Sequence, residues 1–140
     1  VVILAVGCQV VNKVKEVDEV SNESYEVWLA EGTVPEKIKR PDIRKVWDTV
    51  HKMSHHVIVA NDKWGYIDLT EERVNWLLIV VKEEDYREPY KTELLEILER
   101  WKAGDFSQAD QDHNKVWIRL DGTIGKAFGV YEKGTPNWAK

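Results

Sequence analysis

The sequence predicts an all-α protein: a small orthogonal bundle of about four helices, with an N-terminal anchor or stalk and a Gly-rich C-terminal tail. Three observations indicate this fold. Apolar residues recur at helical spacing in four stretches after residue 41, Pro and Gly residues separate these stretches, and the chain from Thr123 onward lacks the helical period. We therefore divide the chain into the end of a membrane anchor or signal segment (1–17), a linker or stalk (18–40) and a helical domain (41–140).

The composition limits the classes of function. A net charge of −5 argues against a nucleic-acid partner, because phosphate binding requires a basic face. The only cysteine, Cys8, allows neither an intramolecular disulfide nor a cysteine-based zinc site. Seven Trp residues in 140 suit the core of a small domain, although a Trp platform exposed for a peptide or glycan is the alternative.

The first eleven residues are apolar and precede Lys13. A membrane-spanning helix needs roughly 20 apolar residues, so this stretch is too short alone but could be the end of such a helix. Two alternatives stay open. Residues 4–8 resemble a lipoprotein processing site in which Cys8 would carry the lipid, with Ala5 departing from that pattern, or the stretch is a plain buried helix or strand.

The first two helices are predicted from their starts and their apolar faces. Pro41 suits the first turn of a helix that runs to His56 or Val57. Thr70 is a good N-cap for a second helix through Val81. The unbroken apolar run at 76–81 could be a buried strand, but the cap and the charged residues after it favour a helix central to the fold.

A corner between two further helices is expected around residues 101–117. Pro89 marks the start of the third helix, and Gly104 ends it in the left-handed conformation. Ser107 is expected to cap the fourth helix, which Gly122 ends. We expect the side chains of three residues to meet beneath this corner: Trp101, His113 and Trp117. One face of the fourth helix should point outward, and it carries Asp112, Lys115 and Arg119.

Histidines supply the one candidate site, a metal centre. His51 and His55 are four residues apart and lie on one face of the first helix, and His113 or Asp110 could supply a third ligand. The Glu of the zinc-protease helix motif is replaced by Lys52. The competing interpretation is that His113, among apolar neighbours, is a hydrogen-bonded core residue.

Other motifs are weaker. Residues 110–121 have the alternating spacing of a calcium loop but lack its glycine at the sixth place, and Gly122–Lys126 is too short for a phosphate loop. The aspartates at 105, 110 and 112 suit a helix N-terminus better than acid–base catalysis. We predict no catalytic residue and no bound cofactor.

Several pieces of the chain resemble a family of uncharacterised small proteins from bacilli, which have an N-terminal membrane segment, a variable linker and a Trp-rich helical domain. The matching stretches are His51–His55, Lys63–Gly65, Leu95–Trp101, Gly104–Asn114 with Trp117, and Gly122–Ala127. The resemblance implies a membrane-anchored protein on the extracytoplasmic face and implies no chemistry.

The sequence therefore favours a non-enzymatic cell-envelope protein that is held to the membrane by its N-terminus and binds an unknown protein or envelope partner through its helical domain. The alternative is a metal-binding module or a metal-dependent hydrolase that uses His51, His55, His113 and Asp110.

Overall fold

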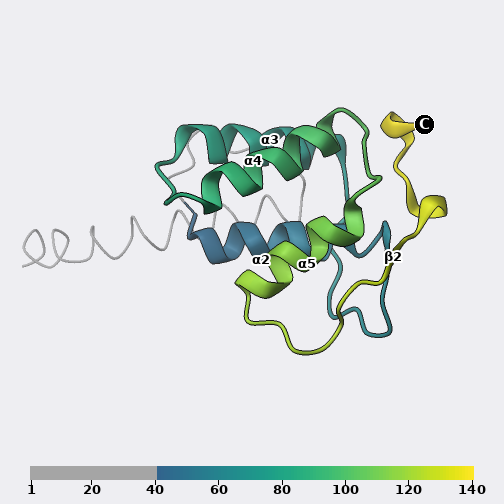
Figure 1. Cartoon of the computed structure of the whole chain (residues 1–140). Helices are drawn as coiled ribbons and strands as arrows, with labels where there is room; N and C mark the ends of the chain where they lie inside the picture. The colour runs from purple at the N-terminus through teal and green to yellow at the C-terminus, as the bar shows by residue number, and fades with distance from the viewer. Residues whose placement is uncertain (1–40) are drawn as a thin grey trace, which may run out of the picture. The chain divides into compact units, whose positions relative to one another are not determined.

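The computed structural model describes residues 41–140, and the predicted anchor and linker lie outside them. The described part contains four α-helices and one two-stranded ribbon, so the predicted helical fold is confirmed. Helix α3 packs against α4 and helix α2 packs against α5, which gives two helix pairs (Figure 1). Among residues 41–140, no helix combines the length and the apolar character needed to cross a membrane.

Helix α2 (Ile43–Ser54) begins two residues later than expected. Asp42 is its N-cap, and one oxygen of its carboxylate accepts a hydrogen bond from Arg44 N at 2.9 Å. A side-chain acceptor satisfies a backbone N–H that has no partner inside the helix, whereas Pro41 can only precede the cap. Val46, Val50 and Met53 bury the apolar face.

Helix α3 (Glu71–Glu83) has the predicted cap and one unpredicted exposed side chain. Thr70 Oγ1 accepts a hydrogen bond from Arg73 N at 3.2 Å, as expected for an N-cap. The apolar run at 76–81 is helical, so the strand alternative is wrong. Ile79 is 53% exposed, however, and the helix is therefore not buried on all sides.

Helix α4 (Tyr90–Lys102) ends as predicted at Gly104, whose φ is +80°. A left-handed residue with no side chain closes the helix at little steric cost. A Cβ on Gly104 would also lie 2.9 Å from the Cα of Ala139, near the C-terminus. Gly104 thus serves two purposes, because it ends α4 and admits the tail.

Helix α5 (Ala109–Arg119) does not use Ser107 as its cap. Gln108 holds the N-cap position without a side-chain bond. Asp105 Oδ1 instead accepts hydrogen bonds from Ser107 N at 3.0 Å and Ser107 Oγ at 2.6 Å, which shapes the turn before the helix. The Ser107 hydroxyl is engaged with a side chain, so the predicted cap is wrong by one residue.

Trp101, His113 and Trp117, which were expected to meet, have different polar partners. Trp101 Nε1 donates to Asp112 Oδ2 at 3.1 Å, and Trp117 Nε1 donates to the carbonyl of Ile124 at 2.9 Å. Asp112, which was expected to point outward, is fully buried. Helix α5 therefore presents Asp112 to α4, while His113 lies against α2.

The C-terminal tail wraps the body of the domain. Strand β2 (Gly129–Val130) pairs antiparallel with β1 (Ile58–Val59), and the 3₁₀ turns η1 (Glu132–Gly134) and η2 (Asn137–Ala139) follow. Trp138 Nε1 donates to the carbonyl of Trp101 at 3.1 Å. The two-residue strands were not predicted, and they fix the tail beside the connection after α2.

Replacement of Gly104 by Val should lower the free energy of unfolding by more than about 1 kcal/mol, because a β-branched residue is strained at φ +80° and its Cβ meets the backbone of Ala139. Urea denaturation measures the loss. Gly129→Ala is the matched control, since its Cβ would contact only the Val59 side chain at an ordinary 3.8 Å. Equal midpoints for the two variants would contradict this role of Gly104.

Candidate metal centre

Three histidines from two helices form a cluster. His51 lies on α2, His55 is the C-cap of that helix one turn further on, and His113 on α5 faces them. Their potential ligand nitrogens all lie within 4.8 Å of one another. The structure thus brings together three of the four residues predicted from the sequence. Asp110, the fourth, is outside the cluster, and its Oδ1 accepts a hydrogen bond from Gln111 N.

The ring of His55 is held by the backbone of the loop after β1. His55 Nδ1 lies 2.6 Å from the carbonyl oxygen of Gly65. Because a carbonyl can only accept, Nδ1 must carry the proton. In the neutral ring, Nε2 is then the unprotonated nitrogen with a lone pair. A hydrogen bond of this kind orients a metal-binding histidine and fixes its tautomer.

The ring of His113 is held in a similar way by a side-chain amide. His113 Nδ1 lies 2.9 Å from Asn114 Oδ1. The orientation of that amide is fixed at both ends by Ala127, whose N–H donates to Oδ1 at 2.8 Å and whose carbonyl accepts from Nδ2 at 2.9 Å. His113 Nδ1 therefore donates, and Nε2 carries the lone pair. That Nε2 is buried and has no hydrogen-bond partner in the described part of the chain.

His51 joins the other two rings. Its ring centroid lies 4.5 Å from that of His55 and 4.6 Å from that of His113. The rings of His55 and His113 are 5.4 Å apart. His51 is half-buried, whereas the other two are almost fully buried, so the cluster approaches solvent on the His51 side.

All three imidazoles are uncharged at neutral pH. Burial and the neighbouring His113 and His55 lower the pKa of His51 to about 3. Burial is also the main cause that lowers the pKa of His55 and of His113, and the Lys63 ammonium adds to both effects. Since a metal binds only the unprotonated ring nitrogen, these shifts remove the competition with protons at pH 7.

The cluster is close to the geometry of a zinc site. Zinc binds histidine nitrogens at roughly 2.0–2.1 Å, which places tetrahedral ligand nitrogens about 3.3 Å apart. The three nitrogens, within 4.8 Å of one another, need shifts of about 1.5 Å or less. Imidazole ligands suit zinc, copper, nickel and cobalt, and three protein ligands leave a coordination position for another molecule.

The fourth histidine and two aspartates outside the predicted site have different partners. His56 lies 5.3 Å, ring to ring, from Tyr66 and outside the cluster. Asp105 is bonded by Ser107, and Asp112 by Arg100 and Trp101. No carboxylate pair for acid–base catalysis is formed by the aspartates at 105, 110 and 112.

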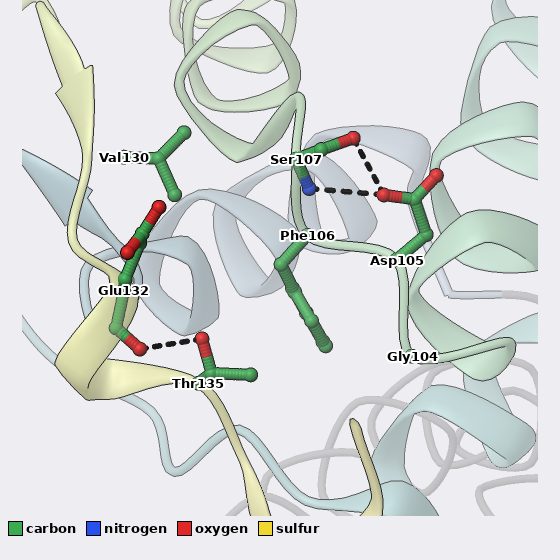
Figure 2. A pocket seen from close by; sticks show the side chains of 7 residues that line it. All are labelled: Gly104, Asp105, Phe106, Ser107, Val130, Glu132 and Thr135. Atoms are coloured by element: carbon green, nitrogen blue, oxygen red, sulfur yellow. Dashed lines mark hydrogen bonds between the residues drawn. The ribbon is translucent and has the colours of Figure 1, made fainter. Parts of the chain in front are cut away.

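An open pocket of about 370 Å³ lies apart from the histidines, between the α4–α5 corner and the tail. Figure 2 shows Phe106 between the Asp105–Ser107 pair and Glu132. Within this pocket, Asp105 is engaged by Ser107, and Thr135 Oγ1 donates to the Glu132 carbonyl at 2.6 Å. The pocket shares no lining residue with the metal centre.

Sequence patterns do not reveal the residues that hold the ligand rings in place. Gly65 acts through its carbonyl, which every residue possesses, and Ala127 acts through both of its backbone groups. Asn114 is next to His113 in the chain, and this adjacency is the only signal that could have suggested a role in holding the ring.

Acid should destabilise the metal-free domain. Histidine in the unfolded chain takes up a proton near pH 6.5, whereas His51 in the folded chain does so near pH 3. The free energy of unfolding is therefore unaffected by His51 above pH 6.5 and decreases as the pH drops toward 3. His51 alone should account for about 2 kcal/mol at pH 5. Urea denaturation with chelator at pH 7.5 and pH 5 measures the loss.

The control compares one variant with the wild type. His51→Gln should reduce the loss of stability between these pH values. The same pH dependence in wild type and His51→Gln would show that the pKa of His51 is not lowered by folding.

Comparison with known proteins gives a family without a function. No curated protein and no solved structure matches the chain. Residues 50–137 match the family of unknown function DUF6241, and this range includes His51, His55 and His113. The match covers more than half of the 140 residues, so the chain belongs to the family of unknown function DUF6241.

Proposed function

We propose that this domain binds one divalent transition-metal ion, with zinc the best fit, through His51, His55 and His113. The observation that carries the proposal is the cluster itself: three uncharged imidazoles on two helices, with their ligand nitrogens within 4.8 Å. Asp110 is left out of the proposed ligand set, because its carboxylate is not part of the cluster.

The competing interpretation is a packed core of histidines with no ligand. A core histidine is normally satisfied by hydrogen bonds, because an unpaired buried polar atom costs about 1–3 kcal/mol. His113 has one satisfied nitrogen and one buried nitrogen without a partner. The pattern of a bonded Nδ1 and a free Nε2 supports a metal ligand over a core residue.

Metal binding is proposed as the activity, without a catalysed reaction. Within residues 41–140, no carboxylate belongs to the cluster, so the proposed ligand set itself supplies no carboxylate general base. The proposal thus favours a metal-binding module over a metal-dependent hydrolase.

Purified without chelator, the protein should contain about one equivalent of zinc by elemental analysis. After stripping, Zn²⁺ at 100 times its Kd should stabilise the fold by about 2.7 kcal/mol, or raise Tm by roughly 10 °C. His113→Leu should keep the helical circular dichroism with a modest stability change, since leucine has a tolerable volume and removes the unpaired nitrogen.

The same variant should lose zinc binding in calorimetric titration, and His56→Gln should retain it. Wild-type protein that carries no metal and shows no binding of added Zn²⁺ would exclude the proposed function. Unchanged binding by His113→Leu would place the metal at another site.

A second proposal is that the domain binds a protein partner of the cell envelope, with membrane attachment through residues 1–17 on the extracytoplasmic face. Exposed apolar side chains on two adjacent loops support a binding surface. Trp64 is 69% exposed and Phe128 65% exposed. The loops are in contact, because a Cβ on Gly125 would lie 2.7 Å from the carbonyl oxygen of Asp62. Exposed aromatic residues are enriched at protein interfaces.

Crosslinking in membranes tests this surface. The wild-type chain should capture a discrete protein, and the Trp64→Ala, Phe128→Ala double variant should lose most of it, because truncated aromatic anchors weaken interfaces. Ile79→Ala, an exposed apolar residue on α3, is the control. Equal capture by all three proteins, or no capture, would count against the surface.

A further inference from the structure

We propose that the metal-loaded site takes an anionic oxygen ligand, a carboxylate or a phosphate group, at its open coordination position, and that Lys63 helps to bind this anion. This inference rests on the proposed function, because it requires a bound metal. It adds the charge and the chemical class of the molecule that the site recognises.

The first step of the argument is the charge of the ligand set. Three neutral imidazoles leave both positive charges of a divalent ion uncompensated. In the described part of the chain, no aspartate, glutamate or cysteine joins the cluster. Because His55 and His113 are almost fully buried, solvent compensates that charge poorly. An anion in the remaining coordination position would compensate the charge of the metal ion.

The second step is the position of Lys63. This lysine lies two residues before Gly65, whose carbonyl oxygen bonds His55 Nδ1 at 2.6 Å. Its ammonium is near enough to the rings of His55 and His113 for its charge to act on both. A cation beside the site disfavours the binding of a metal ion and favours the binding of an anion. The metal ion and the Lys63 ammonium together therefore select a negatively charged ligand.

The third step is the availability of that ammonium. The side chain of Lys63 is half-buried, and within residues 41–140 no carboxylate pairs with it. Lys52, the other lysine near the cluster, differs because its Nζ lies 2.8 Å from Asp48 Oδ2. Among residues 41–140, Lys63 is thus a cation beside the site whose charge is not paired with a carboxylate.

The fourth step is the rigidity of the loop that carries Lys63. Gly65 has a φ of +82°, and a Cβ there would lie 2.9 Å from the side chain of Lys52. Ile67 N donates to the carbonyl of Lys52 at 3.5 Å, a long hydrogen bond that also ties the loop to α2. The loop is held close against the end of α2, which keeps the backbone of Lys63 beside the cluster.

Cobalt-substituted protein provides the test, since the visible absorption of Co²⁺ reports its coordination. Acetate and phosphate are titrated separately, after removal of free Co²⁺ and at constant ionic strength set with perchlorate. Each anion that binds should give a saturable spectral change. A response to acetate alone assigns the carboxylate class, and a response to phosphate alone the phosphate class. Methylamine, a cation at neutral pH, should give no change.

Variants separate the role of Lys63 from a general effect of charge. Lys63→Gln should weaken anion binding at least tenfold while changing the Co²⁺ affinity less than threefold. Lys82→Gln is the control, because the Lys82 ammonium pairs with Glu99 on the surface of α3 and α4 and should not affect the spectrum.

The outcomes distinguish the two proposals. Bound Co²⁺ whose spectrum responds to neither anion would overturn this inference and leave the proposed metal binding intact. Equal anion affinity in wild type and Lys63→Gln would overturn the part assigned to Lys63. A protein that binds no Co²⁺ would overturn the proposed function and this inference together.

Discussion

The arrangement of the domain depends on one buried carboxylate, that of Asp112. It is fully buried at the start of α5 and accepts hydrogen bonds from the Arg100 guanidinium and from Trp101 Nε1, both on α4. Burial raises the pKa of this carboxyl, and the Arg100 charge opposes the rise. Loss of Arg100 would leave the charge of Asp112 buried without compensation, so this contact fixes the rotation of α5 against α4.

That rotation determines where the candidate site forms. His113 follows Asp112 in the helix, and neighbouring helical residues point about 100° apart. With Asp112 turned toward α4, His113 is directed at α2, where His51 and His55 lie one turn apart. Asn114, the next residue, then binds both backbone groups of Ala127 and draws the tail against α5. Three consecutive residues thus join α4, α2 and the tail.

The sequence predicts the parts of this arrangement that depend on local rules. A four-residue spacing places His51 and His55 on one helical face, and a glycine after α4 indicates a left-handed stop. Contacts between distant segments are not predictable in this way. Asp112 was expected to point outward, because an aspartate is seldom buried unless it is paired. Its hydrogen-bond partners lie on another helix, so the local sequence does not reveal them. The two-residue strands are too short to show any alternation.

The histidine cluster is difficult to explain as a device for stability. Leucine in place of His113 would fill a similar volume and would remove the unpaired Nε2 from the core. The present arrangement instead keeps three imidazoles uncharged at a cost that grows as the pH falls. Two of the rings are oriented by acceptors on other segments, Gly65 and the Asn114 amide anchored by Ala127. A core that tolerates an unpaired nitrogen and positions it so specifically is better explained by a ligand than by packing.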